Sequence, residues 1–345
     1  MSQRPKPLPS IEYPRRVQLA HTPTPLQALP RASRKWGRGK RLWIKRDDLT
    51  GSTLSGNKVR KLEFIAAHAQ DQGYDTLITC GGIQSNHCRA TAFVGAQLGL
   101  KVHLLLRGKA PEDPDGNYLL DQLAGAQISC YGTRDYFRDI DALFTQWQDH
   151  YAAAGHKALA VPTGGSDGLG VWGYVRACEE LKQDFNEHGI TQAHLVSATG
   201  SGGTQAGLTA GAALHGLPAT VWGVAVSDDE QYFMRKVDED IDDWRRRYPQ
   251  APVFDYQTRV IDGYVAPGYG RANPEVFTLI AELAALEGIV LDPVYTGKAF
   301  QAMLQEIAAG RFESADDIVF VHTGGLFGLF PQRQALPQGA PADQH

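Results

Sequence analysis

Short runs of aliphatic and β-branched residues recur along the chain, and several of them end in glycines. The run TLITC at 76–80 leads into two glycines, HLVSA at 194–198 leads into TGSGG, and IVFVH at 318–322 leads into TGG. Continuous apolar runs of this length are typical of strands buried on both faces of a parallel sheet. The pattern predicts strands at 42–45, 76–80, 102–106, 128–131, 158–162, 194–198, 221–226 and 318–322.

Stretches with helical periodicity lie between these runs. Within 57–70, for example, apolar residues recur at positions that share one helix face. Helices are predicted at 57–70, 171–181, 203–214, 274–287 and 297–309. Strands that alternate with helices indicate an α/β fold with parallel sheets, and we expect two of them. Ligands of such sheets bind beyond the carboxyl ends of the strands, where the glycines lie.

Composition restricts the class of protein. The chain has 345 residues, 43% hydrophobic and 21% charged, with a formal net charge of −4, which is typical of a globular protein of about two domains. Without a basic surplus we expect neither a nucleic acid nor a membrane as partner. The first ten residues hold three prolines and no apolar core, so we expect no signal peptide and a cytoplasmic location. The four cysteines and 11 histidines show no metal-binding spacing, so no metal is expected.

One segment stands out for its charge. The run VDEDIDD at 237–243 is followed by Trp244 and three arginines. Charge runs of this kind are usually solvated faces, so we expect an exposed helix here.

The segment from Thr199 to Gly207, TGSGGTQAG, lies between a predicted strand and a predicted helix. Glycines let successive backbone N–H groups converge, and a helix N-terminus adds partial positive charge, so the segment fits an anion such as a phosphate. It lacks the lysine of a Walker A loop. Two alternatives stay open: a dinucleotide site with Asp228 as its acidic residue, and a purely structural turn.

Lys58 stands near the predicted start of a helix, just after Gly56. The helix macrodipole disfavours a cation at this end and favours the neutral amine, which is the form that attacks a carbonyl. A solvated basic first turn is the simpler explanation. Tyr269 and Tyr295 each stand among turn residues, where a packed aromatic ring is the commoner role.

Ser85 and Asn86 begin another predicted helix after the glycines at 81–82. An N-cap is the simpler explanation for this pair. His87 follows Ser85 by two residues, a spacing at which helix side chains point apart, so a nucleophile–base pair is not favoured.

Taken together, these segments resemble one enzyme family. The motifs are IKRDD at 44–48, SGNKVRKLEF at 55–64, GGIQSNH at 81–87, TGSGGT at 199–204, APGYG at 266–270, LDPVYTGKAF at 291–300 and HTGG at 322–325. In this order they are similar to the D-cysteine desulfhydrase and 1-aminocyclopropane-1-carboxylate deaminase family of pyridoxal-phosphate enzymes. The resemblance implies fold type II, the tryptophan-synthase-β-like fold, with two mainly parallel sheets, the cofactor in the cleft between two domains, and a homodimer. We expect a large domain at 1–51 and 165–345 and a smaller α/β domain at 52–164.

The resemblance also assigns roles by position. Lys58 is similar to the lysine that binds the cofactor covalently, and Asn86 to the asparagine that hydrogen-bonds its 3′-oxygen. Ser85 matches a serine beside the substrate, and Tyr269 and Tyr295 match two active-site tyrosines. The positions that match cofactor-binding residues are Lys58, Asn86, Gly200, Ser201, Gly202, Gly203, Thr204, Thr296 and Thr323.

Two threonines bear on the activity that the resemblance implies. Thr296 matches the position facing the pyridine nitrogen, where the deaminase branch has a glutamate, and Thr323 stands where that branch has a leucine. Neutral hydroxyls do not keep the ring nitrogen protonated, and the weaker electron sink favours prompt loss of a β-leaving group. The resemblance thus implies β-elimination of D-cysteine, or a related small β-substituted amino acid, to pyruvate, ammonia and sulfide. Lys58 would be the base, and one of the tyrosines the proton donor.

Three alternatives stay open. They are a 1-aminocyclopropane-1-carboxylate deaminase, a lyase for another sulfur amino acid such as cysteate, and a pyridoxal-phosphate-binding protein without turnover. Arg271 suits an anionic substrate side chain, although a surface arginine is the simpler explanation. The sequence leaves open the preferred stereoisomer, the leaving group and which tyrosine donates the proton.

Overall fold

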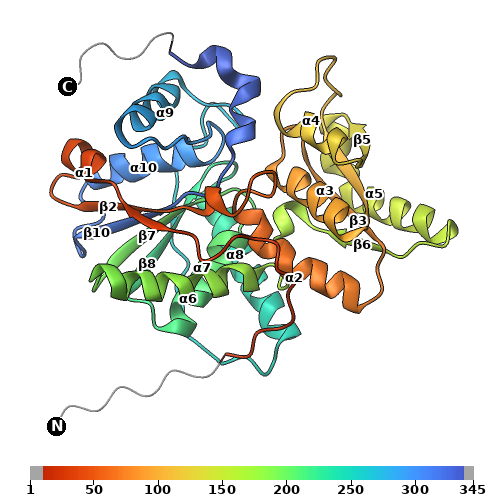
Figure 1. Cartoon of the computed structure of the whole chain (residues 1–345), viewed down its shortest axis with the longest axis horizontal. Helices are drawn as coiled ribbons and strands as arrows, with labels where there is room; N and C mark the ends of the chain where they lie inside the picture. Colours follow the sequence, from red (N-terminus) through yellow and green to blue (C-terminus); the bar gives the residue numbers. More distant parts are fainter. Residues whose placement is uncertain (1–10, 338–345) are drawn as a thin grey trace.

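Two β-sheets with helices on their faces make up the described part of the chain, residues 11–337 of a computed structural model (Figure 1). Every predicted strand is confirmed to within two residues, and the short β1 and β9 are additional. The strands are β1 Leu26–Ala28, β2 Arg41–Lys45, β3 Thr76–Gly82, β4 Lys101–Arg107, β5 Gln127–Tyr131, β6 Ala158–Val161, β7 Ala193–Thr199, β8 Ala219–Ala225, β9 Val260–Ile261 and β10 Asp317–Val321. Residues 1–10, on which the expectation of no signal peptide depends, lie outside the described residues.

The predicted helices are also present. Four of the five agree with the prediction to within one residue, while the helix predicted at 171–181 continues to His188. The helices are α1 Pro30–Trp36, α2 Asn57–Asp71, α3 Asn86–Leu98, α4 Gly116–Leu123, α5 Thr133–Ala153, α6 Val171–His188, α7 Gly203–His215, α8 Glu230–Arg247, α9 Pro274–Glu287 and α10 Thr296–Ala308. None of the helices within 11–337 has the length and apolar character needed to cross a bilayer.

The two sheets confirm the expected α/β architecture. The larger has the order β1-β2-β10-β7-β8-β9 and is parallel except for β1, and the smaller is parallel throughout, with the order β5-β4-β3-β6. All strands of the smaller sheet fall within 52–164, and all strands of the larger sheet fall outside it. The expected division of the chain into two domains, with its boundaries, stays a prediction.

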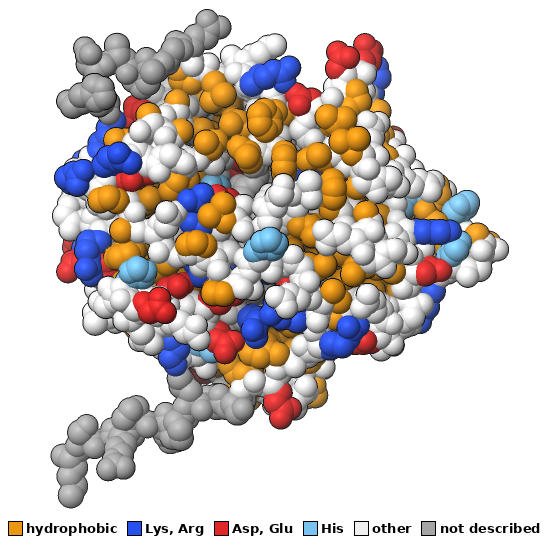
Figure 2. All heavy atoms as spheres, in the orientation of Figure 1, with side chains coloured by type: hydrophobic (Ala, Val, Ile, Leu, Met, Phe, Trp, Pro, Cys, Tyr) orange, Lys and Arg blue, Asp and Glu red, His pale blue; other side chains and the backbone are white. Residues whose placement is uncertain are grey.

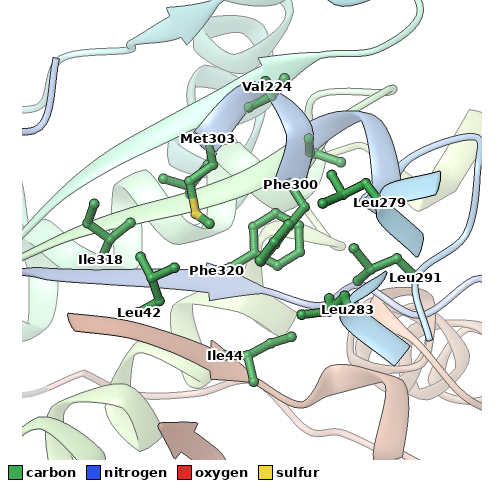
Figure 3. Packing of buried hydrophobic residues seen from close by; sticks show 14 of the residues in the cluster. Leu42, Ile44, Val224, Leu279, Leu283, Leu291, Phe300, Met303, Ile318 and Phe320 are labelled. Carbon is green, nitrogen blue, oxygen red and sulfur yellow. The ribbon is translucent and has the colours of Figure 1, made fainter. Parts of the chain in front are cut away.

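The main core lies between the larger sheet and helices α9 and α10 (Figure 3). Phe300 of α10 packs edge-on against Phe320 of β10, with ring centres 5.1 Å apart. Helices α6 and α7 bury a second apolar cluster against the opposite face of the sheet. Helices therefore cover both faces of the larger sheet, and ligands have access at the strand ends.

Helix α8 corrects one expectation. The charged run at 237–243 belongs to this helix, yet Val237, Ile241 and Trp244 are fully buried. They recur at a spacing of three to four residues and form an apolar stripe that the surrounding charges conceal in the sequence. Asp240 on the same helix is only 3% exposed. The helix is therefore exposed on one side only. Elsewhere, the face in Figure 2 shows acidic and basic side chains interspersed among the described residues.

A buried ionic cluster fixes helix α2 between the two sheets. The Arg60 guanidinium, 2% exposed, donates two hydrogen bonds to Asp47 at 2.8 Å and two to Glu180 of α6 at 2.8 and 2.9 Å. Tyr174 also donates to Asp47 at 2.6 Å. Burial raises the pKa of Asp47, but the neighbouring Arg60 outweighs it and brings the pKa below its ordinary value. The cluster links three segments that are distant in sequence.

We predict that Asp47→Asn lowers the free energy of unfolding by about 3 kcal/mol, because breaking a buried ion pair leaves charge without compensation. The measurement is urea unfolding of the purified protein. Asp139→Asn is a matched control, since Asp139 pairs with Arg138 on an exposed stretch of α5, and its unfolding midpoint should not move. Equal midpoints for the two variants would contradict a structural role of the cluster.

Candidate active site

A cavity of about 420 Å³ lies where the carboxyl ends of strands from both sheets meet. Its wall includes the ends of β3, β4 and β7 and the loop after β10. Among the positions singled out in the sequence, the cavity brings together Lys58, Ser85, Asn86, Gly200, Ser201, Gly202, Thr204, Tyr269, Tyr295 and Thr323. Gly203 and Thr296 are not among the residues that line it. Arg271 is exposed and also does not line the cavity, which agrees with a surface arginine.

Lys58 is the second residue of α2, and the start of this helix is bound to the loop after β10. The Asn57 N–H donates to the Thr323 carbonyl at 3.1 Å. At Gly56, with φ +98°, a Cβ would lie only 2.7 Å from the same oxygen, so the close approach requires glycine. Burial lowers the pKa of Lys58 to about 8. Roughly a tenth of the amine is thus neutral at pH 7, which is far more than for a lysine of ordinary pKa.

Gly164 provides the space beside Lys58. Its φ is +70°, and a Cβ there would lie 2.3 Å from Ser201 Oγ and 3.0 Å from Lys58 Nζ. Both the backbone conformation and the crowding exclude a side chain at this position. The backbone of the 163–165 turn therefore approaches the lysine more closely than any other residue type permits.

The glycine loop at 200–203 ends at the N-terminus of α7, as the anion-site interpretation expected. Thr204 Oγ1 accepts a hydrogen bond from the Asn57 side chain at 2.9 Å, and Ser201 Oγ lies 2.8 Å from Ser166 Oγ. Thr199 lines the cavity, and its Oγ1 is buried without a hydrogen-bond partner among the described residues. Backbone N–H groups, hydroxyls and a helix dipole thus surround one space.

Lys61 beside this loop escaped the sequence analysis. Its Nζ donates to the Gly164 carbonyl at 3.1 Å and to Ser166 Oγ at 3.2 Å. A Cβ on Gly203 would lie 2.7 Å from that Nζ, so the amine lies against the loop. Burial, together with the charge of Lys58, lowers the pKa of Lys61 well below its ordinary value. The spacing of three residues from Lys58, which puts both on one helix face, was the available signal.

The start of α3 forms another part of the cavity wall. Ser85 is the N-cap, as the simpler explanation expected, and its hydroxyl accepts from the Cys88 N–H at 3.2 Å. Asn117, a second residue that the sequence analysis missed, donates from Nδ2 to Asn86 Oδ1 at 2.9 Å. This bond fixes the orientation of the Asn86 amide and leaves its NH₂ group available to an acceptor in the cavity.

His87 does not pair with Ser85. Its Nε2 lies 2.8 Å from Thr79 Oγ1, and that hydroxyl donates its only proton to the Val161 carbonyl at 2.8 Å. The imidazole must therefore be the donor, with its proton on Nε2. Burial and the charges of Lys58 and Lys61 lower the pKa of His87 well below its ordinary value. His87 is a neutral part of the wall.

Tyr269 and Tyr295 form a hydroxyl pair in the cavity. Their oxygens are 2.5 Å apart, and the rings meet edge-to-face with centres 6.0 Å apart. Burial raises the pKa of both phenols above the ordinary value. Both hydroxyls therefore stay protonated at neutral pH, and either one is able to donate a proton into the cavity.

Thr296 lies elsewhere than the resemblance implied. It is 0% exposed, its hydroxyl donates to Asp292 Oδ1 at 2.7 Å, and it accepts from the Asp292 N–H at 2.8 Å. Asp292 also accepts the N–H groups of Tyr295 and Thr296 at the start of α10, so its carboxylate holds the threonine away from the cavity. Of the two threonines, Thr323 alone faces the cavity.

These groups fit a cofactor that carries an aldehyde and a phosphate. The cavity offers an amine of lowered pKa, a glycine loop at a helix N-terminus, and an amide donor of fixed orientation. The model of the family described as "Pyridoxal-phosphate dependent enzyme" matches residues 17–324. The chain belongs to this family. It is therefore an enzyme that uses pyridoxal phosphate, and the family decides against the dinucleotide interpretation of the glycine loop.

Two named relatives are similar to this chain over most of its length. The D-cysteine desulfhydrase of Klebsiella pneumoniae is 41% identical over 323 residues, which cover 91% of this chain and 95% of that protein. The bifunctional D-cysteine desulfhydrase/1-aminocyclopropane-1-carboxylate deaminase of Arabidopsis thaliana is 39% identical over 339 residues, 94% of this chain and 80% of that protein. The resemblance noted in the sequence is thereby confirmed.

Solved structures agree with the fold. The crystal structure of an ACC deaminase homologue has 34% identity and a TM-score of 0.82, over 93% of this chain and 95% of that one. A fungal L-serine ammonia-lyase from Rhizomucor miehei, at 16% identity, has a TM-score of 0.64 over 91% and 98% of the two chains. The expected fold type II is confirmed by these likenesses.

We predict that covalent binding of pyridoxal phosphate to the apoprotein speeds up as the pH rises, with the half-maximal rate near pH 8. The reason is that the neutral form of Lys58 grows above its pKa of about 8 rather than above 10.5. Visible absorbance measures the rate. Lys58→Ala should give no covalent band, whereas Lys61→Ala, one turn along the same helix, should keep it. A covalent band in the Lys58 variant would show that another lysine binds the cofactor.

We further predict that Gly164→Ala weakens the affinity for pyridoxal phosphate by at least about tenfold, because its Cβ crowds Ser201 and Lys58. Gly155→Ala is the matched control. Its φ of +80° imposes similar backbone strain, but no atom lies within 4 Å of the added Cβ. The dissociation constants are measured by titration of the cofactor into each apoprotein. Equal weakening in both variants would mean that strain, not crowding, is responsible.

Proposed function

We propose that this enzyme eliminates sulfide from D-cysteine and that water hydrolyses the remaining unsaturated amino acid, so that the products are pyruvate, ammonia and sulfide. The observation that carries the proposal is that Thr323, which by the resemblance stands where the deaminase branch has a leucine, lines the cavity. Among the described residues that line the cavity, Asp228 is the only carboxylate, and it stands at the exposed end of the loop after β8. The names of the relatives from Klebsiella and Arabidopsis support the same activity.

In this proposal Lys58 binds pyridoxal phosphate covalently, and the amide NH₂ of Asn86 binds the cofactor's 3′-oxygen. The phosphate would be held by Gly200, Ser201, Gly202, Gly203 and Thr204, with the Lys61 amine as a further N–H donor beside the loop. When bound, the cofactor supplies an electron sink for the electrons left on the substrate's Cα. Thr323 offers the ring nitrogen a neutral partner, which favours expulsion of a β-leaving group over opening of a cyclopropane ring.

The remaining steps belong to side chains of the cavity. Once the substrate amino group has replaced Lys58 in its bond to the cofactor, the freed Lys58 amine, with its pKa near 8, would be the general base that takes the Cα proton. The N-terminus of α3 and the Ser85 hydroxyl orient the substrate carboxylate. The Tyr269–Tyr295 pair donates a proton to the departing sulfur, because burial keeps both hydroxyls protonated. Leaving-group protonation thus takes place on the Cβ side, and proton removal at Cα.

The alternative activity is the opening of 1-aminocyclopropane-1-carboxylate. The Arabidopsis relative is named for both activities, so its name supports the alternative as well. A homodimer and a cytoplasmic location, both expected from the sequence, stay predictions.

We predict that the purified holoenzyme releases sulfide and pyruvate from D-cysteine in equal amounts. It should do so at least about tenfold more efficiently than it turns over 1-aminocyclopropane-1-carboxylate. Sulfide and pyruvate are assayed in one sample, with L-cysteine as the stereochemical comparison. Faster turnover of the cyclopropane acid, or pyruvate without sulfide, would contradict the proposal.

The proton-donor role adds a second readout to this experiment. Tyr295→Phe should lower kcat on D-cysteine by about 10²-fold, but much less on β-chloro-D-alanine, because chloride leaves without a proton. Tyr264→Phe is the matched control, since Tyr264 bonds Glu306 and does not line the cavity. Equal losses on both substrates would assign Tyr295 to packing.

A further inference from the structure

Arg107 lies on the cavity wall but has no part in the mechanism described above. It is the last residue of β4 and pairs in register with Gly82 of β3. A Cβ on Gly82 would lie 3.7 Å from the Tyr269 ring and 3.9 Å from Arg107 Nη2. Because glycine occupies that position, the space over the guanidinium stays open toward the cavity.

Three aromatic rings surround the Arg107 guanidinium. Its central carbon lies 4.7 Å from the ring centre of Phe137, 5.0 Å from that of Tyr269 and 5.8 Å from that of Tyr136. Contacts with ring faces hold a cation in place, but they leave its charge and its N–H donors uncompensated. Within residues 11–337 the guanidinium makes no hydrogen bond or ion pair. Arg60, by contrast, uses all of its guanidinium nitrogens on carboxylates and a hydroxyl.

Two other amine groups at or beside the cavity have partners within residues 11–337, and Lys58 would be bound to the cofactor under the proposed function. Lys236 pairs with Asp240, and Lys61 bonds Gly164 and Ser166 beside the glycine loop. Under the proposed function the phosphate takes the glycine loop, and the substrate α-carboxylate takes the start of α3. The carboxylate of Asp228 on the wall forms no ion pair with Arg107. Among the described residues around the cavity, Arg107 therefore remains as a fixed cation with free donors, on the side where the tyrosine pair lies.

We propose that Arg107 binds a second anionic group of the substrate, a carboxylate or a sulfonate carried on the β-carbon, and so selects amino acids with a negatively charged side chain. This inference rests on the proposed function for the placement of the α-carboxylate, and it extends the substrate class beyond cysteine. The planar guanidinium fork suits both oxyanions. The bound group would lie next to the Tyr269–Tyr295 hydroxyl pair, since Arg107 lies over the Tyr269 ring.

The test titrates the holoenzyme with D-aspartate and with D-asparagine, which are alike in shape and differ in charge. The visible absorbance of the bound cofactor reports the dissociation constants without any elimination. The wild type should bind aspartate at least about tenfold more tightly than asparagine. A hydrogen bond to a charged group usually contributes a binding free energy of this size. Arg107→Gln should bring the ratio of the two constants to within about twofold of one. Arg107→Lys, which keeps the charge, should restore part of the preference.

Controls separate this site from general charge effects. Arg259 also lies over an aromatic ring, that of Trp222, but does not line the cavity, so Arg259→Gln should keep the wild-type ratio. D-cysteate in a parallel titration shows whether a sulfonate is accepted like a carboxylate. An unchanged ratio in Arg107→Gln, or no binding of aspartate by the wild type, would overturn the inference. Sulfide release from D-cysteine tests the proposed function independently, so one is able to fail while the other holds.

Discussion

The placement of helix α2 depends on a cation that has no access to water. Arg60 is buried, and a buried charge is tolerated only when hydrogen-bonded opposite charges surround it. Asp47 comes from the turn after β2 and Glu180 from α6, so satisfying one guanidinium joins three segments. Lys58 lies two residues before Arg60 on the same helix. The requirement to compensate one charge thus also fixes the position of the reactive amine.

Backbone groups provide much of the remaining framework of the cavity. The N-termini of α3 and α7 both open onto it, and each offers N–H groups and a partial positive charge to an anion. Glycines at 56, 164 and 203 allow approaches of backbone or lysine that any Cβ would block. The carboxylate of an amino acid and a phosphate group both carry negative charge, and each helix N-terminus suits one such anion. Backbone groups alone therefore make the cavity suitable for anions, without any contribution from charged side chains.

Burial then sets the protonation states of the side chains in the cavity. It lowers the pKa of Lys58 and His87 and raises the pKa of Tyr269 and Tyr295, because a low dielectric disfavours the charged form of each group. The amine becomes available as a base, and the phenols remain proton donors. Arg107 is the exception, since a guanidinium stays charged in proteins and the surrounding rings stabilise it without neutralising it. Among the described residues, the site thus offers three kinds of reactive or binding group. They are a lysine base, two neutral phenols and, at Arg107, a cation of fixed position.

The sequence by itself determined the strands, most helices, the glycine turns and the family, because these depend on local periodicity and on motifs contained in short segments. Ten of the site residues that it singled out line the cavity, since they stand at strand ends, helix starts and turns. It could not place Thr296, whose hydroxyl is captured by Asp292, or show that one face of α8 is buried. Nor could it show that aromatic rings surround Arg107, because these rings come from α5 and from a loop more than a hundred residues away. Tertiary structure decided these points because the partner of a polar side chain is chosen by proximity in space, which no local pattern encodes.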